Sequence, residues 1–86
     1  MPTIGRFDAL DVMIFRNDHE PPHFHVVGPG FSGRFTIDGS ELLSCKGKPR
    51  PRDIRAIEAW GQRHRDKLYK NWWLAKEGKP PEKITD

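Results

Sequence analysis

The sequence has very little cysteine and no long apolar run. Its single cysteine, Cys45, excludes an internal disulfide framework and fits a reducing compartment. No stretch approaches the roughly 18 consecutive apolar residues that cross a membrane. The opening residues "MPTIGRFDAL" also lack the charged leader and apolar core of a signal peptide. We therefore expect a cytoplasmic protein without membrane contact.

An excess of charge of one sign is also missing, because 15 Lys and Arg stand against 12 Asp and Glu. This mildly basic balance permits nucleic acid or an acidic protein as a partner and requires neither. The 86 residues have room for one domain. A chain so short buries only about 60% of its unfolded surface, so a partner or a homo-oligomer would add stability.

The two halves of the chain differ in the spacing of their apolar residues. Up to Phe35 these residues come in the short β-prone runs "LDVMIF", "HFHVV" and "GRFTI", separated by the turn formers "RNDHEPP" and "GPGFSG". This pattern predicts an antiparallel meander of three or four strands, which "DGSELL" can extend. From Asp53 to Lys76 the spacing changes to steps of three and four, which predicts an amphipathic helix. Its apolar stripe comprises Ile54, Ile57, Trp60, His64, Leu68, Trp72 and Ala75.

The predicted fold class is therefore α+β, a sheet packed by a C-terminal helix. Asp53 is suited to the helix N-cap or first turn. Gly61 can bend or divide the helix, because glycine costs about 1 kcal/mol relative to alanine in a helix interior. Gly78 and the prolines after it end the helix. We expect a single domain over residues 1–78 and a flexible tail over residues 79–86.

The segment "DHEPPHFHV", residues 18–26, holds three of the four histidines. If Phe24 and Val26 point toward the helix, strand alternation places His23 and His25 side by side on the opposite face. We therefore predict that this segment forms the rim of the functional surface, with both histidines outside the main core.

Three roles are open to this histidine cluster. His23 and His25 could supply half of a metal site, with His19 or Glu20 folding back across the paired prolines as a third ligand. His23, His25 and His19 are also candidate catalytic residues, because histidine can act as acid and base near neutral pH. The third role is structural, since the two prolines stiffen the turn before the strand. No CxxC or HExxH pattern accompanies the cluster, so we assign no cofactor and no firm metal site; His23 and His25 are the ligands if a metal binds.

The connector "KGKPRP" and its flanks concentrate positive charge. Lys46, Lys48, Arg50 and Arg52 are candidates for phosphate contacts with nucleic acid, and the alternative is a solvated linker that the prolines keep irregular.

The C-terminal half adds one histidine and three tryptophans. His64 lies on the apolar stripe, where a packed role is favoured over one beside the strand histidines. Trp60 and Trp72 share the stripe and are expected in the core. Trp73 falls off it and is the candidate for an exposed contact.

Four segments together resemble the bacterial family catalogued as domain of unknown function 4160: "MPTIGRF", "NDHEPPHFHV", "KGKPRP" and "EAWGQRHRDKLYKNW". The resemblance runs from Met1 to about Gly78. Its most specific part is "DHxPPHFHV", and a second part has the pattern "W...HR..L...W" between Trp60 and Trp72. It implies a small intracellular protein encoded beside a second small protein, an arrangement similar to a toxin and antitoxin pair.

The residues and the resemblance lead to three functional hypotheses. In the first, the chain is the toxin-like component of a two-gene module, acts on RNA or translation, and has the small protein from the neighbouring gene as its partner. In the second, it is a non-enzymatic interaction module whose His and Trp residues shape a protein interface. The third is a small metal-binding protein based on histidine. The sequence leaves open whether the protein is an enzyme.

Overall fold

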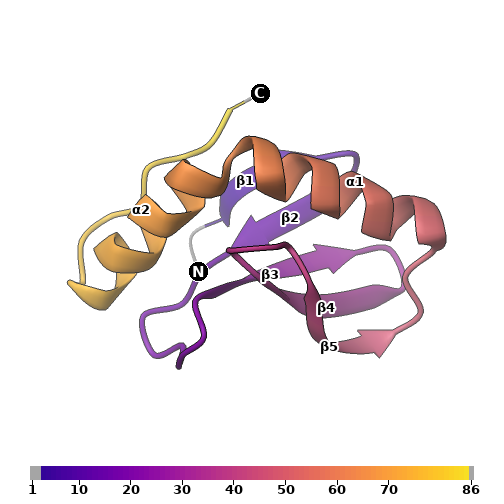
Figure 1. Cartoon of the computed structure of the whole chain (residues 1–86), viewed down its shortest axis with the longest axis horizontal. Coiled ribbons are helices and arrows are strands. Elements are labelled where there is room, and N and C mark those ends of the chain that lie inside the picture. Colours follow the sequence, from indigo (N-terminus) through magenta and orange to yellow (C-terminus); the bar gives the residue numbers. More distant parts are fainter. Residues whose placement is uncertain (1–2, 86) are drawn as a thin grey trace.

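The computed structural model describes residues 3–85 and shows an α+β fold. An antiparallel sheet has its strands in chain order, and both helices lie along one face of it (Figure 1). The elements are β1 (Thr3–Phe7), β2 (Leu10–Met13), β3 (His23–Gly28), β4 (Phe31–Thr36), β5 (Leu42–Gly47), α1 (Pro51–Arg63) and α2 (Arg65–Lys76).

The predicted meander is confirmed, but it has five strands rather than three or four. The sequence pattern does not predict the hairpin between β1 and β2, because its turn is formed by Asp8 and Ala9 and has no glycine or asparagine. Both residues have positive φ, +47° and +63°, as in a two-residue turn that matches the strand twist. At the other edge, β5 extends through Lys46 and Gly47, which we had assigned to an irregular connector.

The core lies between the sheet and the helices, and the predicted stripe contributes Ile57, Trp60, Leu68 and Trp72. Strand alternation supplies the opposite side, because Phe24 and Val26 of β3 are fully buried as predicted. Trp60 stacks on Phe7 with ring centroids 4.7 Å apart. The buried apolar residues are Ile4, Leu10, Val12, Ile14, Phe24, Val26, Phe31, Phe35, Ile37, Ile57, Trp60, Leu68, Trp72 and Ile84.

The helical segment divides at His64, not at Gly61. Gly61 continues α1, and its missing side chain serves close packing instead. A Cβ built there would lie 2.1 Å from the Ser40 hydroxyl oxygen and 3.3 Å from the Phe24 ring. Asp53 is in the first turn of α1, where its carboxylate accepts hydrogen bonds from the backbone and guanidinium of Arg50.

Residues 79–85, in the segment for which we expect a flexible tail, contact the rest of the domain. Ile84 is buried in the core, and its N–H donates to the Ile4 carbonyl at 2.7 Å. Asn71 of α2 holds the backbone of Glu82 in the same segment. Ile84 packs beside β1, a tertiary contact that the polar composition of "PPEKITD" does not indicate. Asp86 lies outside the described residues.

The second face of the sheet is open, since both helices lie on the other face (Figure 1). Register pairs His25 of β3 with Met13 of β2 and Arg34 of β4, and pairs Arg34 with Ser44 of β5. These side chains therefore form one row across the open face. All residues of β5 are exposed, so this strand forms an exposed edge of the sheet. No helix in residues 3–85 is long and apolar enough to cross a membrane.

Candidate metal centre

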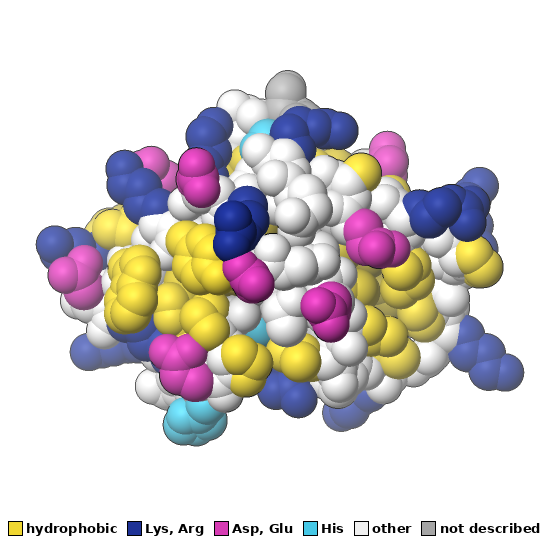
Figure 2. All heavy atoms as spheres, in the orientation of Figure 1, with side chains coloured by type: hydrophobic (Ala, Val, Ile, Leu, Met, Phe, Trp, Pro, Cys, Tyr) yellow, Lys and Arg dark blue, Asp and Glu magenta, His cyan; other side chains and the backbone are white. Residues whose placement is uncertain are grey.

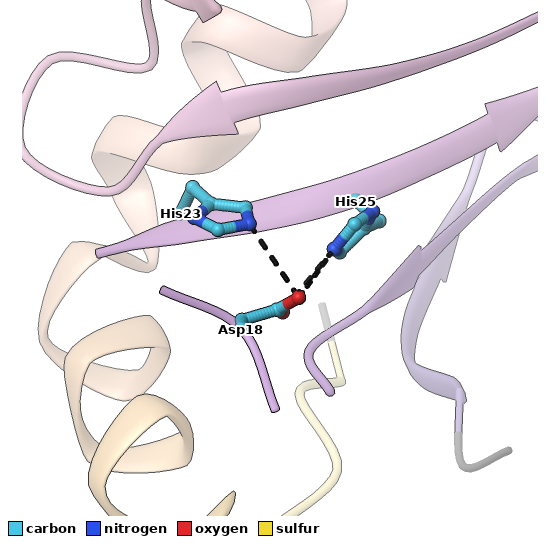
Figure 3. A group of neighbouring side chains, drawn as sticks. All are labelled: Asp18, His23 and His25. Atoms are coloured by element: carbon cyan, nitrogen blue, oxygen red, sulfur yellow. Dashed lines mark hydrogen bonds and ion pairs between the residues drawn. The ribbon is translucent and has the colours of Figure 1, made fainter. Parts of the chain in front are cut away.

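Three side chains of the "DHEPPHFHV" segment converge at the start of β3 (Figure 3). His23 and His25 are two residues apart on the strand, and their ring centroids are 5.2 Å apart, as the predicted side-by-side placement requires. Asp18 comes from the loop between β2 and β3 and points up between them. One nitrogen from each ring and one carboxylate oxygen all lie within 4.8 Å of one another.

The Asp18 carboxylate is held in place by its own loop. Its Oδ2 accepts a hydrogen bond from the Phe15 backbone N–H at 2.9 Å, and the Asp18 N–H donates to the Phe15 carbonyl. This reciprocal pair closes a tight turn and aims the carboxylate at the strand. Oδ1 lies 3.1 Å from His25 Nε2 and 3.6 Å from His23 Nε2.

The orientation of the His23 ring follows from its other nitrogen. Nδ1 lies 2.9 Å from the Pro21 carbonyl oxygen, which can only accept, so Nδ1 carries a hydrogen and donates it. In a neutral ring Nε2 is then an acceptor. This atom is buried, has no hydrogen-bond partner within residues 3–85 and faces the Asp18 carboxylate. Two acceptors that face each other need a cation between them, either a proton on Nε2 or a metal ion.

The predicted position of His23 outside the core is wrong. The residue is only 3% exposed, and its ring lies 5.5 Å from that of Trp72 on α2. Strand alternation does turn it away from Phe24, but α2 and the Asp18 loop enclose it at the end of the sheet. His25 is partly exposed and contacts Phe15 edge to face, with ring centroids 4.5 Å apart.

The third member of the cluster is Asp18, not His19 or Glu20 as expected. Both of the latter side chains are exposed, and neither belongs to the converging group. The peptide bond between Glu20 and Pro21 is cis. The sequence places three possible ligands before the prolines, and only the folded loop distinguishes Asp18 from its neighbours.

The other sequence candidates lie apart from this cluster. His64 is buried at the junction of α1 and α2 and packs against Trp60, with ring centroids 4.9 Å apart, in agreement with a packed role. Trp60 and Trp72 are core residues, and Trp73 is 58% exposed, as predicted.

The four cationic candidates do not lie on a single loop. Lys46 belongs to β5, Lys48 follows the strand, and Arg52 is in α1. Arg50 binds Asp53 with its backbone and guanidinium groups, so it helps to begin α1. In the view of Figure 2, Lys and Arg side chains are spread around the whole outline with acidic side chains between them.

The described residues thus define a class: a small α+β domain with one open sheet face and an Asp-His-His cluster at the end of a central strand. The chain belongs to the family described as Domain of unknown function (DUF4160), whose family model matches residues 11–73 and so includes the whole cluster. No curated protein and no solved structure matched the chain.

Proposed function

We propose that this protein binds one divalent transition-metal ion through Asp18, His23 and His25. The observation that carries the proposal is the buried His23 Nε2. In the described part of the chain it has no hydrogen-bond partner, and it faces the Asp18 carboxylate beside His25 Nε2. A metal ion at this point would satisfy all three groups at once. The proposal favours the metal hypothesis over acid and base catalysis by His23, because a ring that is 3% exposed has little access to substrate.

The spacing and surroundings of the three groups fit this role. Metal bonds of about 2.1 Å at tetrahedral angles place ligand atoms roughly 3.4 Å apart. The carboxylate oxygen lies 3.1 Å and 3.6 Å from the two ring nitrogens, and all three atoms lie within 4.8 Å of one another, so side-chain rotations would bring them to this spacing. The hydrogen bond from His23 Nδ1 to Pro21 is the kind of outer contact that fixes the ring and tautomer of a metal-bound histidine.

The donor set indicates which ions to expect. Two imidazoles and a carboxylate, without thiolate, suit Zn²⁺ or Fe²⁺. Structural zinc sites have four protein ligands, whereas three ligands leave positions for water or substrate. We therefore propose an open site that is reached from the side of the partly exposed His25 and that can polarise a bound group, not a site that only stabilises the fold.

Metal content and affinity test this function directly. Protein purified without a histidine tag should contain or take up one Zn²⁺ or Fe²⁺ per chain, measured by mass spectrometry of the metal and by calorimetric titration. Asp18→Ala and His25→Ala should each weaken binding by at least tenfold. His19→Ala is the matched control, because it removes an exposed histidine from the same segment and should not change affinity. Equal loss in all three variants, or no binding by the parent protein, would reject the proposal.

A toxin-like action on RNA or translation is a second candidate function. The observation that favours it is the pair of exposed cations, Arg34 and Lys46, on the open face near His25. We expect growth arrest on expression, relief by the product of the neighbouring gene, and loss of arrest in Asp18→Ala. A stable complex with that product but no arrest would favour the interaction module instead.

A further inference from the structure

A groove crosses the open face of the sheet, and one of the proposed metal ligands, His25, lines it. One side of the groove is formed by Met13 of β2, by Phe15 after it, and by His25 and Val27 of β3. The other side is formed by Arg34 of β4 and Lys46 of β5. Val27 is 42% exposed, which makes the floor of the groove partly apolar. No acidic side chain is among the described residues that line this groove. Its occupant should therefore combine an apolar or aromatic part with negative charge.

Arg34 is placed to bind the charged part of such an occupant. It pairs with His25 across β3 and β4, so the two side chains are immediate neighbours on the open face. Its Nε donates to the Ser44 hydroxyl at 2.8 Å, which orients the guanidinium. Within residues 3–85 Arg34 forms no ion pair, so its terminal N–H groups are available to an anion.

We propose that this groove binds a phosphate ester of a nucleoside, with the phosphate held by Arg34 and the base lying over Phe15 and Met13. The planar guanidinium matches phosphate oxygens with two parallel hydrogen bonds, and an aromatic side chain stacks on any base. We also propose, resting on the proposed function, that a phosphate oxygen would occupy an open coordination position of the metal ion bound to His25. Two sources share this chemistry, a free nucleotide and a single strand of nucleic acid.

The test compares two probes on protein loaded with Zn²⁺. Calorimetry measures the affinity for AMP, and fluorescence anisotropy measures the affinity for a labelled RNA of ten uridines. Arg34→Gln should weaken the binding of both probes by roughly tenfold or more, since it removes charge-assisted hydrogen bonds. The affinity for Zn²⁺ itself should not change. Ser44→Ala should have a smaller effect in the same direction, because it frees the guanidinium to move.

Arg55→Gln is the matched control, because it removes the same charge from an exposed position on α1, in the helical layer. Loss of binding in this control equal to that in Arg34→Gln would show general charge attraction and reject the proposal, as would absence of binding by either probe. Binding of the RNA more than tenfold tighter than AMP identifies a strand as the source, and similar affinities identify a free nucleotide.

Metal titration separates this inference from the proposed function. If the protein takes up no metal but AMP binding still depends on Arg34, the metal function is wrong and the phosphate site stands. If Zn²⁺ binds at Asp18 and His25 but Arg34→Gln leaves both probes unaffected, the metal function stands and the phosphate site is wrong. If both hold, Asp18→Ala should weaken AMP binding in the presence of Zn²⁺ and not in its absence.

Discussion

Asn71 and Glu82 exchange two hydrogen bonds, from the Asn71 amide to the Glu82 carbonyl at 2.9 Å and from the Glu82 N–H to the Asn71 amide oxygen at 2.8 Å. The Asn71 amide thus makes the same pair of hydrogen bonds as the backbone of a neighbouring strand would, and it attaches the last described segment to α2. Asn71 is 1% exposed, so its side chain is enclosed between α2 and this segment. The segment is therefore part of the domain.

The first prediction follows from this pair. Asn71→Ala should lower the free energy of unfolding by about 1 to 3 kcal/mol, because it removes a buried side chain together with both of its hydrogen bonds to the backbone of Glu82. Urea denaturation followed by circular dichroism measures the loss. Lys83→Ala, at an exposed position in the same segment, should stay within about 0.5 kcal/mol of the parent. A similarly small loss for Asn71→Ala would place the segment outside the cooperative domain.

The second prediction concerns removal of the metal. At a Zn²⁺ concentration a hundredfold above Kd, binding to the folded form should add about 2.7 kcal/mol of stability. For a domain of this size that corresponds to a rise of roughly 10 °C or more in Tm. A chelator should reverse the rise. Differential scanning calorimetry of Asp18→Ala should show no rise, and a shift that persists in this variant would point to metal bound elsewhere.

The third prediction concerns the pH dependence of metal binding at the same site. Protons compete with a metal ion for imidazole nitrogens, so the affinity for Zn²⁺ should fall as pH is lowered from about 8 to about 6. Calorimetric titration at several pH values, with release of protons on binding, measures this competition. Binding that is insensitive to pH would be inconsistent with histidine ligands.

The fourth prediction concerns Asp53 at the start of α1. Hydrogen bonds from the Arg50 side chain, and then from its backbone N–H, hold the pKa of Asp53 below its ordinary value of 3.8. A carboxyl whose pKa is lower in the folded state stabilises the fold above the unfolded pKa, and this contribution is lost as pH falls through the folded pKa. Asp53→Ala should therefore be less stable than the parent at pH 7. Urea denaturation should show the difference between the two proteins shrinking as pH is lowered below 3.8, and a constant difference would contradict the role of the charge.

The fifth prediction tests the contact between Gly61 and Ser40. Gly61→Ala should destabilise the protein by about 1 to 3 kcal/mol, although alanine favours helix, because the new methyl group meets Ser40. Adding Ser40→Gly removes the clash and suits the positive φ of +53° at this position. The double variant should recover most of the loss in urea denaturation. Additive losses would show that the two positions do not interact.

Periodicity predicted the parts of this fold that depend on burial along one element. The stripe of Trp60, Leu68 and Trp72 is buried, and the alternation in β3 places His23 and His25 together. These features follow from side-chain spacing within a single strand or helix, so they can be predicted from the sequence alone.

The features that the sequence concealed depend on contacts between elements. Asp18 was distinguished from His19 and Glu20 only by the turn that its carboxylate forms with Phe15. Gly61 stays helical and packs against Ser40 from the β4–β5 connection, while the helix divides at His64, so the position of the division did not follow from the low helix propensity of glycine. Ile84 joins the core through contacts with β1 that no local pattern encodes.

The position of Cys45 offers a practical way to label the protein without blocking the open face of the sheet. It is the only cysteine of the chain and is exposed on β5. Strand alternation turns its side chain away from Arg34, toward the side of Gly33 that faces Phe35. A maleimide fluorophore attached to this thiol would therefore leave the groove free, without any substitution in the protein. The rate of labelling should stay the same when a nucleotide lies in the groove.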